Sequence, residues 1–228
     1  MTHIVRGLPE AGGMRAVVVG ARAAQKLQTR QALLDAALRL MADRNLSALS
    51  LREVSREAGI VPAGFYRHFP DLDSLGAALV EQSLGGLRTT LRAVRAGVTD
   101  SDEIARRSID VLAREVRGQR AQFRFIARER HGGVARVREA IREQLRLIGE
   151  ELATDLLTRN ATAAAVLGTW DRRDVAMFTD LVVNHMVSTA AAILDAPAGQ
   201  AGAERRVITL ARKQLRLIVL GARHWTEG

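Results

Sequence analysis

The stretch LREVSREAGIVPAGFYRHFP, residues 51–70, contains two short helical patterns on either side of Gly59. Ser50 can cap the first helix, and Glu53 lies three residues later, which is the spacing of a capping box. Gly59 can end that helix, and Pro62 occupies a favoured first position of the next one. Two short helices around a tight glycine turn predict a helix-turn-helix unit.

The second of these helices mixes aromatic with polar side chains. We expect Phe65 and Phe69 to anchor it on Leu51, Val54, Ala58 and Ile60, so that its other face is free. Ala63 and Gly64 are small enough for close approach to base edges. Arg67 can bind a guanine or a phosphate, and Tyr66 and His68 can donate to phosphates. The pattern therefore predicts a recognition helix for DNA.

Composition agrees with a polyanionic partner. The 228 residues carry a net charge of +9, nearly all of the excess being arginine, and residues 22–70 carry eight basic side chains against four acidic ones. Such a basic excess favours nucleic acid, an anionic membrane surface or an acidic ligand as the partner. The chain has no cysteine, which excludes disulfides, thiol catalysis and cysteine-held zinc or iron–sulfur centres.

Helical periodicity continues through almost the whole sequence, and alternating β-branched runs are nearly absent. We predict an all-α protein: a flexible N-terminal extension at 1–21, a three-helix helix-turn-helix domain at 22–70, and a helical ligand-binding and dimerisation domain at 71–228. In the last domain the expected helices are about 72–98, 102–117, 120–130, 134–159, 171–195 and 203–224. No apolar run approaches the ~20 residues of a membrane span, and residues 1–25 lack a signal-peptide pattern, so we expect a cytoplasmic protein.

Residues 50–75, SLREVSREAGIVPAGFYRHFPDLDSL, resemble the DNA-binding region of TetR-family transcriptional regulators, and the resemblance covers about residues 22–80. It implies that Tyr66 and His68 contact phosphates, with Ala63, Gly64 and Arg67 nearest the bases. The full set of candidate DNA-binding residues is Thr29, Arg30, Ser50, Arg52, Ala63, Gly64, Tyr66, Arg67 and His68. Two positions depart from the family pattern: Val61 replaces the usual Ser or Thr cap, and Leu72 replaces the usual Lys.

Two further segments, 22–38 and 123–145, resemble the FabR/DesT type, repressors of unsaturated fatty-acid synthesis. That resemblance implies a long-chain acyl-CoA or acyl thioester as the ligand. Apolar residues of the C-terminal helices can line its cavity, and arginines beside Gly132 and Gly133 can clamp phosphates. The candidate ligand-binding residues are Phe123, Phe125, Ile126, Arg128, Arg130, Trp170, Met177, Phe178, Leu181, Val182, His185 and Met186.

The last two helical segments, 174–194 and 205–225, are amphipathic with wide apolar faces. Paired across a two-fold axis they would form a four-helix interface, and a dimer presents two recognition helices to a palindromic operator. We therefore expect a homodimeric, ligand-responsive repressor of double-stranded DNA, with no cofactor and no membrane partner.

Other classes of function remain open. A repressor of the same type could sense another apolar small molecule, and a basic helical protein could lie on anionic lipid. An enzyme is not expected, because no nucleophile–base pair, Walker motif or dinucleotide fingerprint occurs. The five scattered histidines do not form a metal-binding pair, so no metal site is expected either.

Overall fold

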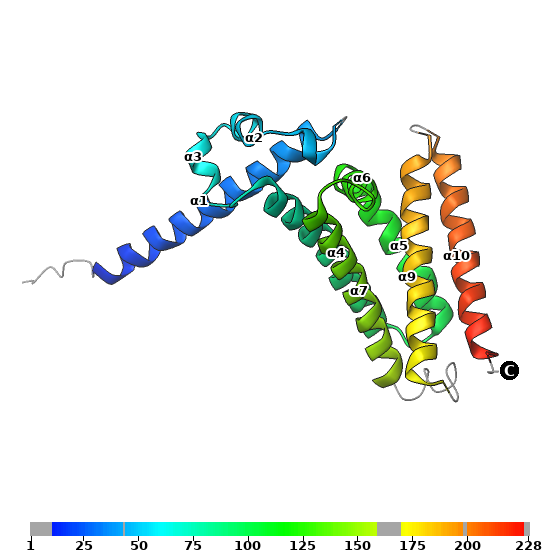
Figure 1. The fold of residues 1–228 in the computed structure, drawn as a ribbon. Coiled ribbons are helices and arrows are strands. Elements are labelled where there is room, and N and C mark those ends of the chain that lie inside the picture. Colours follow the sequence, from blue (N-terminus) through cyan, green and yellow to red (C-terminus); the bar gives the residue numbers. More distant parts are fainter. Residues whose placement is uncertain (1–10, 43, 159–169, 198–199, 226–228) are drawn as a thin grey trace, which may run out of the picture.

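A computed structural model describes residues 11–42, 44–158, 170–197 and 200–225, which form an all-α protein without strands in these ranges (Figure 1). This confirms the predicted fold class. The elements are α1 (Ala11–Leu40), the 3-10 helix η1 (Leu46–Ala48), α2 (Leu51–Glu57), α3 (Pro62–Phe65), α4 (Leu72–Gly97), α5 (Ser101–Gly118), α6 (Arg120–Glu129), α7 (Ala135–Thr158), α9 (Arg172–Asp195) and α10 (Ala201–Arg223).

Three local features differ from the sequence prediction. Helix α1 begins at Ala11, so residues 11–21 belong to it rather than to the expected flexible extension, while residues 1–10 lie outside the described residues. The 3-10 helix η1 was not expected. Helix α3 ends at Phe65, and the chain continues to Phe69 as a turn that the backbone bond from the Phe69 N–H to the Phe65 carbonyl holds at 3.0 Å.

The N-terminal unit is held by a small aromatic and aliphatic core and by ion pairs between α1 and α2. Phe65 and Phe69 are both buried and lie 5.8 Å apart between ring centroids. Arg39 of α1 pairs with Glu57 at 2.7 Å, and Arg44, which follows α1, pairs with Glu53 at 3.2 Å. At the turn, Gly59 has φ of 71°, a conformation that favours glycine.

Helix α4 leads from this unit into the C-terminal bundle, where it packs along α7 (Figure 1). At the far end of this pair, the buried Arg95 donates to Asp155 at 2.5 Å and lies 3.9 Å from Glu151. Helices α9 and α10 run antiparallel and meet where His185 Nε2 lies 3.0 Å from the Ala211 carbonyl oxygen. In the described ranges α9 alone is long and apolar enough to cross a membrane. Its packing against α5, α7 and α10 accounts for that apolar character.

The two units meet where α6 approaches the end of α1. The Arg128 guanidinium donates to the carbonyls of Met41 and Ala42, and the buried Glu129 carboxylate accepts the Leu46 N–H at 3.2 Å. On the opposite side of Leu46, its side chain lies so close to Gly76 that a Cβ there would be 2.5 Å from Leu46 Cδ2. We call this contact of α6 with Met41, Ala42, η1 and α4 the α6 junction.

The capping box at the start of α2 is formed as expected. Glu53 N–H donates to the Ser50 hydroxyl at 3.2 Å, and the Glu53 carboxylate accepts from the Ser50 N–H at 2.9 Å. The Ser50 hydroxyl also donates to the Glu53 carboxylate at 2.8 Å, and this bond, followed by those from the Ser50 N–H and from Arg44, lowers the pKa of Glu53 to about 2. The carboxylate is therefore charged throughout the physiological range.

We predict that Ser50→Ala destabilises the protein by about 1 kcal/mol, because the cap is lost. In a thermal melt at neutral pH this corresponds to a drop of roughly 2–4 °C in Tm. Since the folded-state pKa of Glu53 is depressed, the wild-type advantage is present above the unfolded pKa of 4.5 and declines as the pH falls towards 2. An advantage that grows on acidification would contradict this account.

Candidate functional site

The surface of α3 separates buried anchors from exposed polar side chains, as the sequence predicts. Phe65 is fully buried, whereas Tyr66 is 63% exposed and Arg67 is also exposed. Ala63 is exposed and Gly64 half-buried, so the helix presents little side-chain bulk in front of its backbone. Such a surface can lie against the base edges of a DNA groove.

The turn after α3 carries a positive field. Burial, followed by the charges of Lys26, Arg30 and Arg67, lowers the pKa of His68 below its usual 6.5. The imidazole is therefore mainly neutral at physiological pH, and the neighbouring cations repel a further positive charge. The same cations attract an anion, which makes this face suited to DNA phosphates.

The remaining predicted DNA-binding residues flank this face or support it. Arg30 stacks on the Phe69 ring, 4.7 Å from its centroid, so it fixes α1 against the recognition turn. The Thr29 hydroxyl donates to the Gln25 carbonyl at 2.9 Å. Ser50 is engaged in the capping box, and Arg52 is exposed on α2. Val61 is the N-cap of α3 and supplies no side-chain cap bond, as its substitution for Ser or Thr implies.

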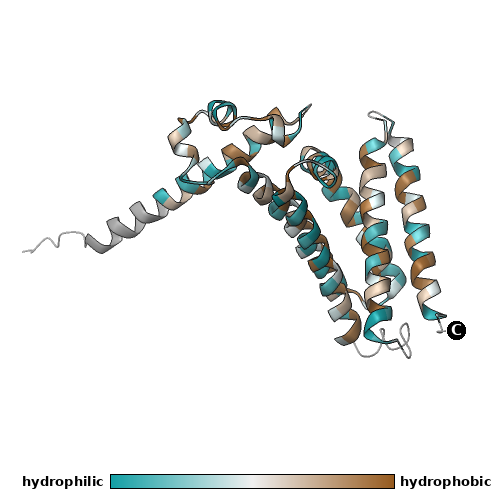
Figure 2. Cartoon of the chain, viewed as in Figure 1, coloured by the Kyte–Doolittle hydropathy of each residue, from teal (hydrophilic) through white to brown (hydrophobic). Residues whose placement is uncertain are grey.

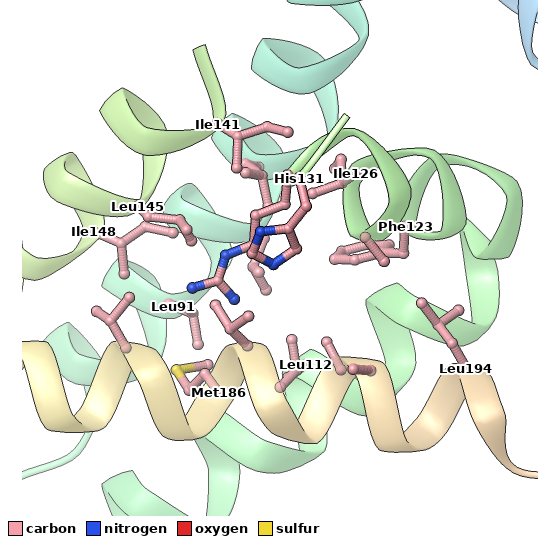
Figure 3. A pocket seen from close by; sticks show the side chains of 18 residues that line it. Leu91, Leu112, Phe123, Ile126, His131, Ile141, Leu145, Ile148, Met186 and Leu194 are labelled. Atoms are coloured by element: carbon pink, nitrogen blue, oxygen red, sulfur yellow. The ribbon is translucent and has the colours of Figure 1, made fainter. Parts of the chain in front are cut away.

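The C-terminal bundle contains a cavity of about 290 Å³ between α4, α5, α6, α7 and α9 (Figure 3). Its lining is apolar except for Arg130 and His131, which come from the turn between α6 and α7. The lining residues are Leu84, Leu87, Leu91, Leu112, Phe123, Ile126, Ala127, Arg130, His131, Ile141, Leu145, Ile148, Val183, Met186, Val187, Ala190, Ala191 and Leu194.

Four of the residues predicted to bind ligand line this cavity: Phe123, Ile126, Arg130 and Met186. The other eight are not among the residues that line it, and their role in ligand binding stays a prediction. Phe125 is buried on the side of α6 that faces Gly76, and Arg128 is used at the α6 junction. Met177 and Leu181 lie on the exposed face of α9, at 48% and 51% exposure.

The last four of these eight residues lie on α9 or next to its start. They are Trp170, Phe178, Val182 and His185. Trp170 and Phe178 form an edge-to-face pair with centroids 5.7 Å apart. His185 contacts the Ala211 carbonyl of α10. Val182 is buried but is not among the cavity residues. Trp170 precedes α9, and Phe178 and His185 make their contacts away from the cavity, whereas Val182 lies one turn from Met186 on the same side of the helix.

Sequence reasoning missed the contributions of α4 and α7 and the His131 side chain. Leu84, Leu87 and Leu91 on α4 follow the i, i+3, i+7 spacing of one helical face, and Ile141, Leu145 and Ile148 on α7 follow the equivalent i, i+4, i+7 spacing. These stripes mark a helix face that packs inward. They do not distinguish a filled core from a cavity, so the signal alone could not have identified the site.

The turn that carries Arg130 and His131 is held tightly. Arg138 of α7 donates to the Gly132 carbonyl at 2.5 Å. A Cβ at Gly132 would collide with the Glu129 carboxylate and would lie 3.1 Å from the Glu129 Cα. Glu129 also accepts the Leu46 N–H, so one carboxylate touches both the cavity turn and the α6 junction.

Comparison with known proteins agrees with this geometry. Residues 33–79 match the family model described as bacterial regulatory proteins, tetR family, so the chain carries a DNA-binding domain of the TetR type. Solved structures share the whole fold. The fatty acid degradation regulator FadR from Bacillus halodurans is 15% identical, with 86% of this chain and 97% of that chain covered and a TM-score of 0.65.

Two other solved structures show the same similarity. The transcriptional regulator FadR from Bacillus subtilis, in complex with stearoyl-CoA, is 15% identical over 84% of this chain and 98% of that chain, with a TM-score of 0.67. The TetR-family regulator PfmR from Thermus thermophilus is 19% identical over 82% and 97%, with a TM-score of 0.58.

We predict that Arg67→Ala reduces the preference for specific over random DNA, because it removes the long donor side chain expected nearest the bases. Fluorescence anisotropy on both kinds of duplex measures the effect, and the expected loss in specific affinity is about 1–3 kcal/mol. Arg142→Ala, which removes the same charge from an exposed site on α7, is the control. Equal losses in the two variants would show that Arg67 contributes charge alone.

Proposed function

We propose that this protein is a ligand-responsive transcriptional repressor that binds a palindromic operator as a homodimer and is controlled by an acyl ligand in the bundle cavity. The observation that carries the proposal is the combination of a TetR-type recognition surface with an apolar cavity joined to it through α6. The similarity to two FadR regulators, one of them in complex with stearoyl-CoA, supports fatty-acid metabolism as the setting.

The dimer is supported by the outer faces of α9 and α10. Met177 and Leu181 on α9, with Leu210 and Leu217 on α10, are each about half exposed or more, and Figure 2 shows apolar residues recurring along both helices. Burying such a face against its copy is favourable at about 25 cal/mol per Å² of apolar surface. A two-fold axis there would place two recognition helices on one side of the dimer.

The α6 junction provides a route from cavity to DNA-binding domain. Ile126 and Arg130 of the α6 segment line the cavity, whereas Arg128 and Glu129 between them hold Met41, Ala42 and Leu46. A ligand that displaces α6 must therefore move the end of α1 or break these bonds. Ligand binding then shifts the population between two placements of the DNA-binding domain, only one of which fits the operator.

The proposed function is tested by fluorescence anisotropy on DNA from upstream of the protein's own gene and of neighbouring lipid-synthesis genes, titrated with and without saturated and unsaturated acyl-CoA. Palindrome-specific binding that shifts about tenfold with ligand, equivalent to 1.4 kcal/mol of coupling, is the expected result. Binding without sequence preference, together with binding to anionic vesicles, would favour a membrane-surface protein instead.

We predict that Leu217→Glu, at a side chain that is 70% exposed, converts the dimer into a monomer, because it places a charge in the apolar interface. Light scattering coupled to size exclusion measures the mass. Leu27→Glu is the matched control, since Leu27 is 68% exposed on α1 of the other domain. A Leu217→Glu protein that remains dimeric would place the interface elsewhere.

A second prediction concerns the α6 junction. Arg128→Ala removes the two bonds to the Met41 and Ala42 carbonyls, just after α1, so the ligand-induced change in operator affinity should fall from about tenfold to about threefold or less. Arg124→Ala, at an exposed position of the same helix, should leave the change intact. The ratio of operator Kd values with and without ligand is the readout. An undiminished ratio in Arg128→Ala would rule out this route.

A further inference from the structure

The polar groups of the cavity are all of one sign. The lining contains two basic side chains, Arg130 and His131, and no acidic one. Figure 3 shows His131 directed into the cavity from the α6–α7 turn, and Arg130 of the same turn is also among the lining residues. In the part of the chain that the structure describes, neither side chain makes a hydrogen bond or an ion pair.

Arg130 is half-buried and His131 is exposed, so both lie where the cavity meets the surface. A guanidinium beside an apolar wall and without a protein partner favours a ligand with an anionic group. The turn cannot readily withdraw, because Arg138 holds the Gly132 carbonyl and the Glu129 side chain packs against Gly132. The Glu129 carboxylate is itself engaged by the Leu46 N–H. The arrangement thus keeps two donors at one end of an apolar cavity, which suits a ligand with an apolar body and an anionic end.

The volume of the cavity limits the length of the apolar chain that the ligand can carry. A methylene group occupies about the volume of a water molecule, roughly 30 Å³, so a cavity of about 290 Å³ holds a chain of about ten carbons. A palmitoyl or stearoyl chain exceeds this space. Because protein interiors are close-packed, a chain of that length would require the surrounding helices to separate.

We infer that the ligand is a medium-chain amphiphilic anion, with about eight to twelve carbons in the cavity and its anionic group bound by Arg130 and His131. The inference rests on the ligand-sensing function proposed above and names the ligand class for the same cavity. The anionic group can be the carboxylate of a free fatty acid, which ends the chain directly, or a phosphate of an acyl-CoA whose pantetheine arm folds back to the cavity entrance, because both accept bidentate bonds from arginine.

Isothermal titration calorimetry on the full-length protein tests both parts. The first series compares octanoate, decanoate, dodecanoate, palmitate and stearate, and the matching acyl-CoA esters form a second series that distinguishes the carboxylate from the phosphate source. Affinity should peak at ten to twelve carbons in one or both series. Tighter binding of palmitoyl or stearoyl ligands than of decanoyl ligands would overturn the assignment of chain length.

The second test uses Arg130→Gln and His131→Gln, with Arg124→Gln as the control that loses the same charge outside the cavity. Decanoate, or decanoyl-CoA if that series binds, should lose about tenfold or more in affinity for Arg130→Gln, equivalent to 1.4 kcal/mol. The loss should be smaller for His131→Gln and absent for Arg124→Gln. Decanol, which has no anionic group, should bind wild type and variants alike.

The outcomes separate this inference from the proposed function. Equal losses for decanol and decanoate, or no loss in either variant, would overturn the roles of Arg130 and His131 while leaving a ligand-controlled repressor in place. If no acyl ligand of any length binds, the inference and the proposed acyl control both fail. Specific operator binding, measured in parallel, decides separately whether the protein is a DNA-binding repressor.

Discussion

The buried bond between the Glu129 carboxylate and the Leu46 N–H is the contact on which the rest of the structure depends. A carboxylate that is 2% exposed is costly to bury, so it persists only where its bonds compensate for lost hydration. Its position fixes η1 against α6, and the close approach of Gly76 to Leu46 fixes α4 on the other side. The orientation of the recognition surface therefore depends on α6, the helix that also lines the cavity.

The arginines serve distinct purposes according to what surrounds them. Arg39 and Arg44 are paired with α2 carboxylates and build the N-terminal unit, whereas Arg67 is exposed beside α3. Arg95 joins α4 to α7 through Asp155. Net charge predicts a polyanionic partner but does not distinguish these uses, because a guanidinium is equally suited to a carboxylate, a carbonyl or a phosphate.

The sequence predicted those features whose interacting residues lie close together along the chain. The capping box at Ser50 and Glu53, the turn at Gly59 and the aromatic anchors of α3 all depend on residues within a few positions of one another. The helix boundaries of the C-terminal bundle were predicted to within about two residues for the same reason. The cavity was only partly predicted, since four of the residues predicted to bind ligand line it, whereas Leu84 and Ile141 went unrecognised.

Sequence reasoning could not tell which side chains face the cavity, and one physical reason explains this. Whether Phe125 or Phe123 faces the cavity depends on how α6 is rotated between α4 and α9, and no local pattern encodes that rotation. Arg128 and Arg130 likewise looked equivalent in sequence, but they lie two residues apart and therefore on different sides of the helix. One holds the DNA-binding domain and the other faces the cavity.

Hydrogen–deuterium exchange at the α6 junction tests the central claim most directly. Exchange is compared in the free protein and with saturating decanoyl-CoA or decanoate, in peptides that contain Leu46 and in peptides that contain Glu129. If α6 couples the cavity to the DNA-binding domain, ligand should change the protection of both peptides together. A ligand that alters the cavity helices α4 and α7 while leaving the Leu46 peptide unchanged would contradict the account.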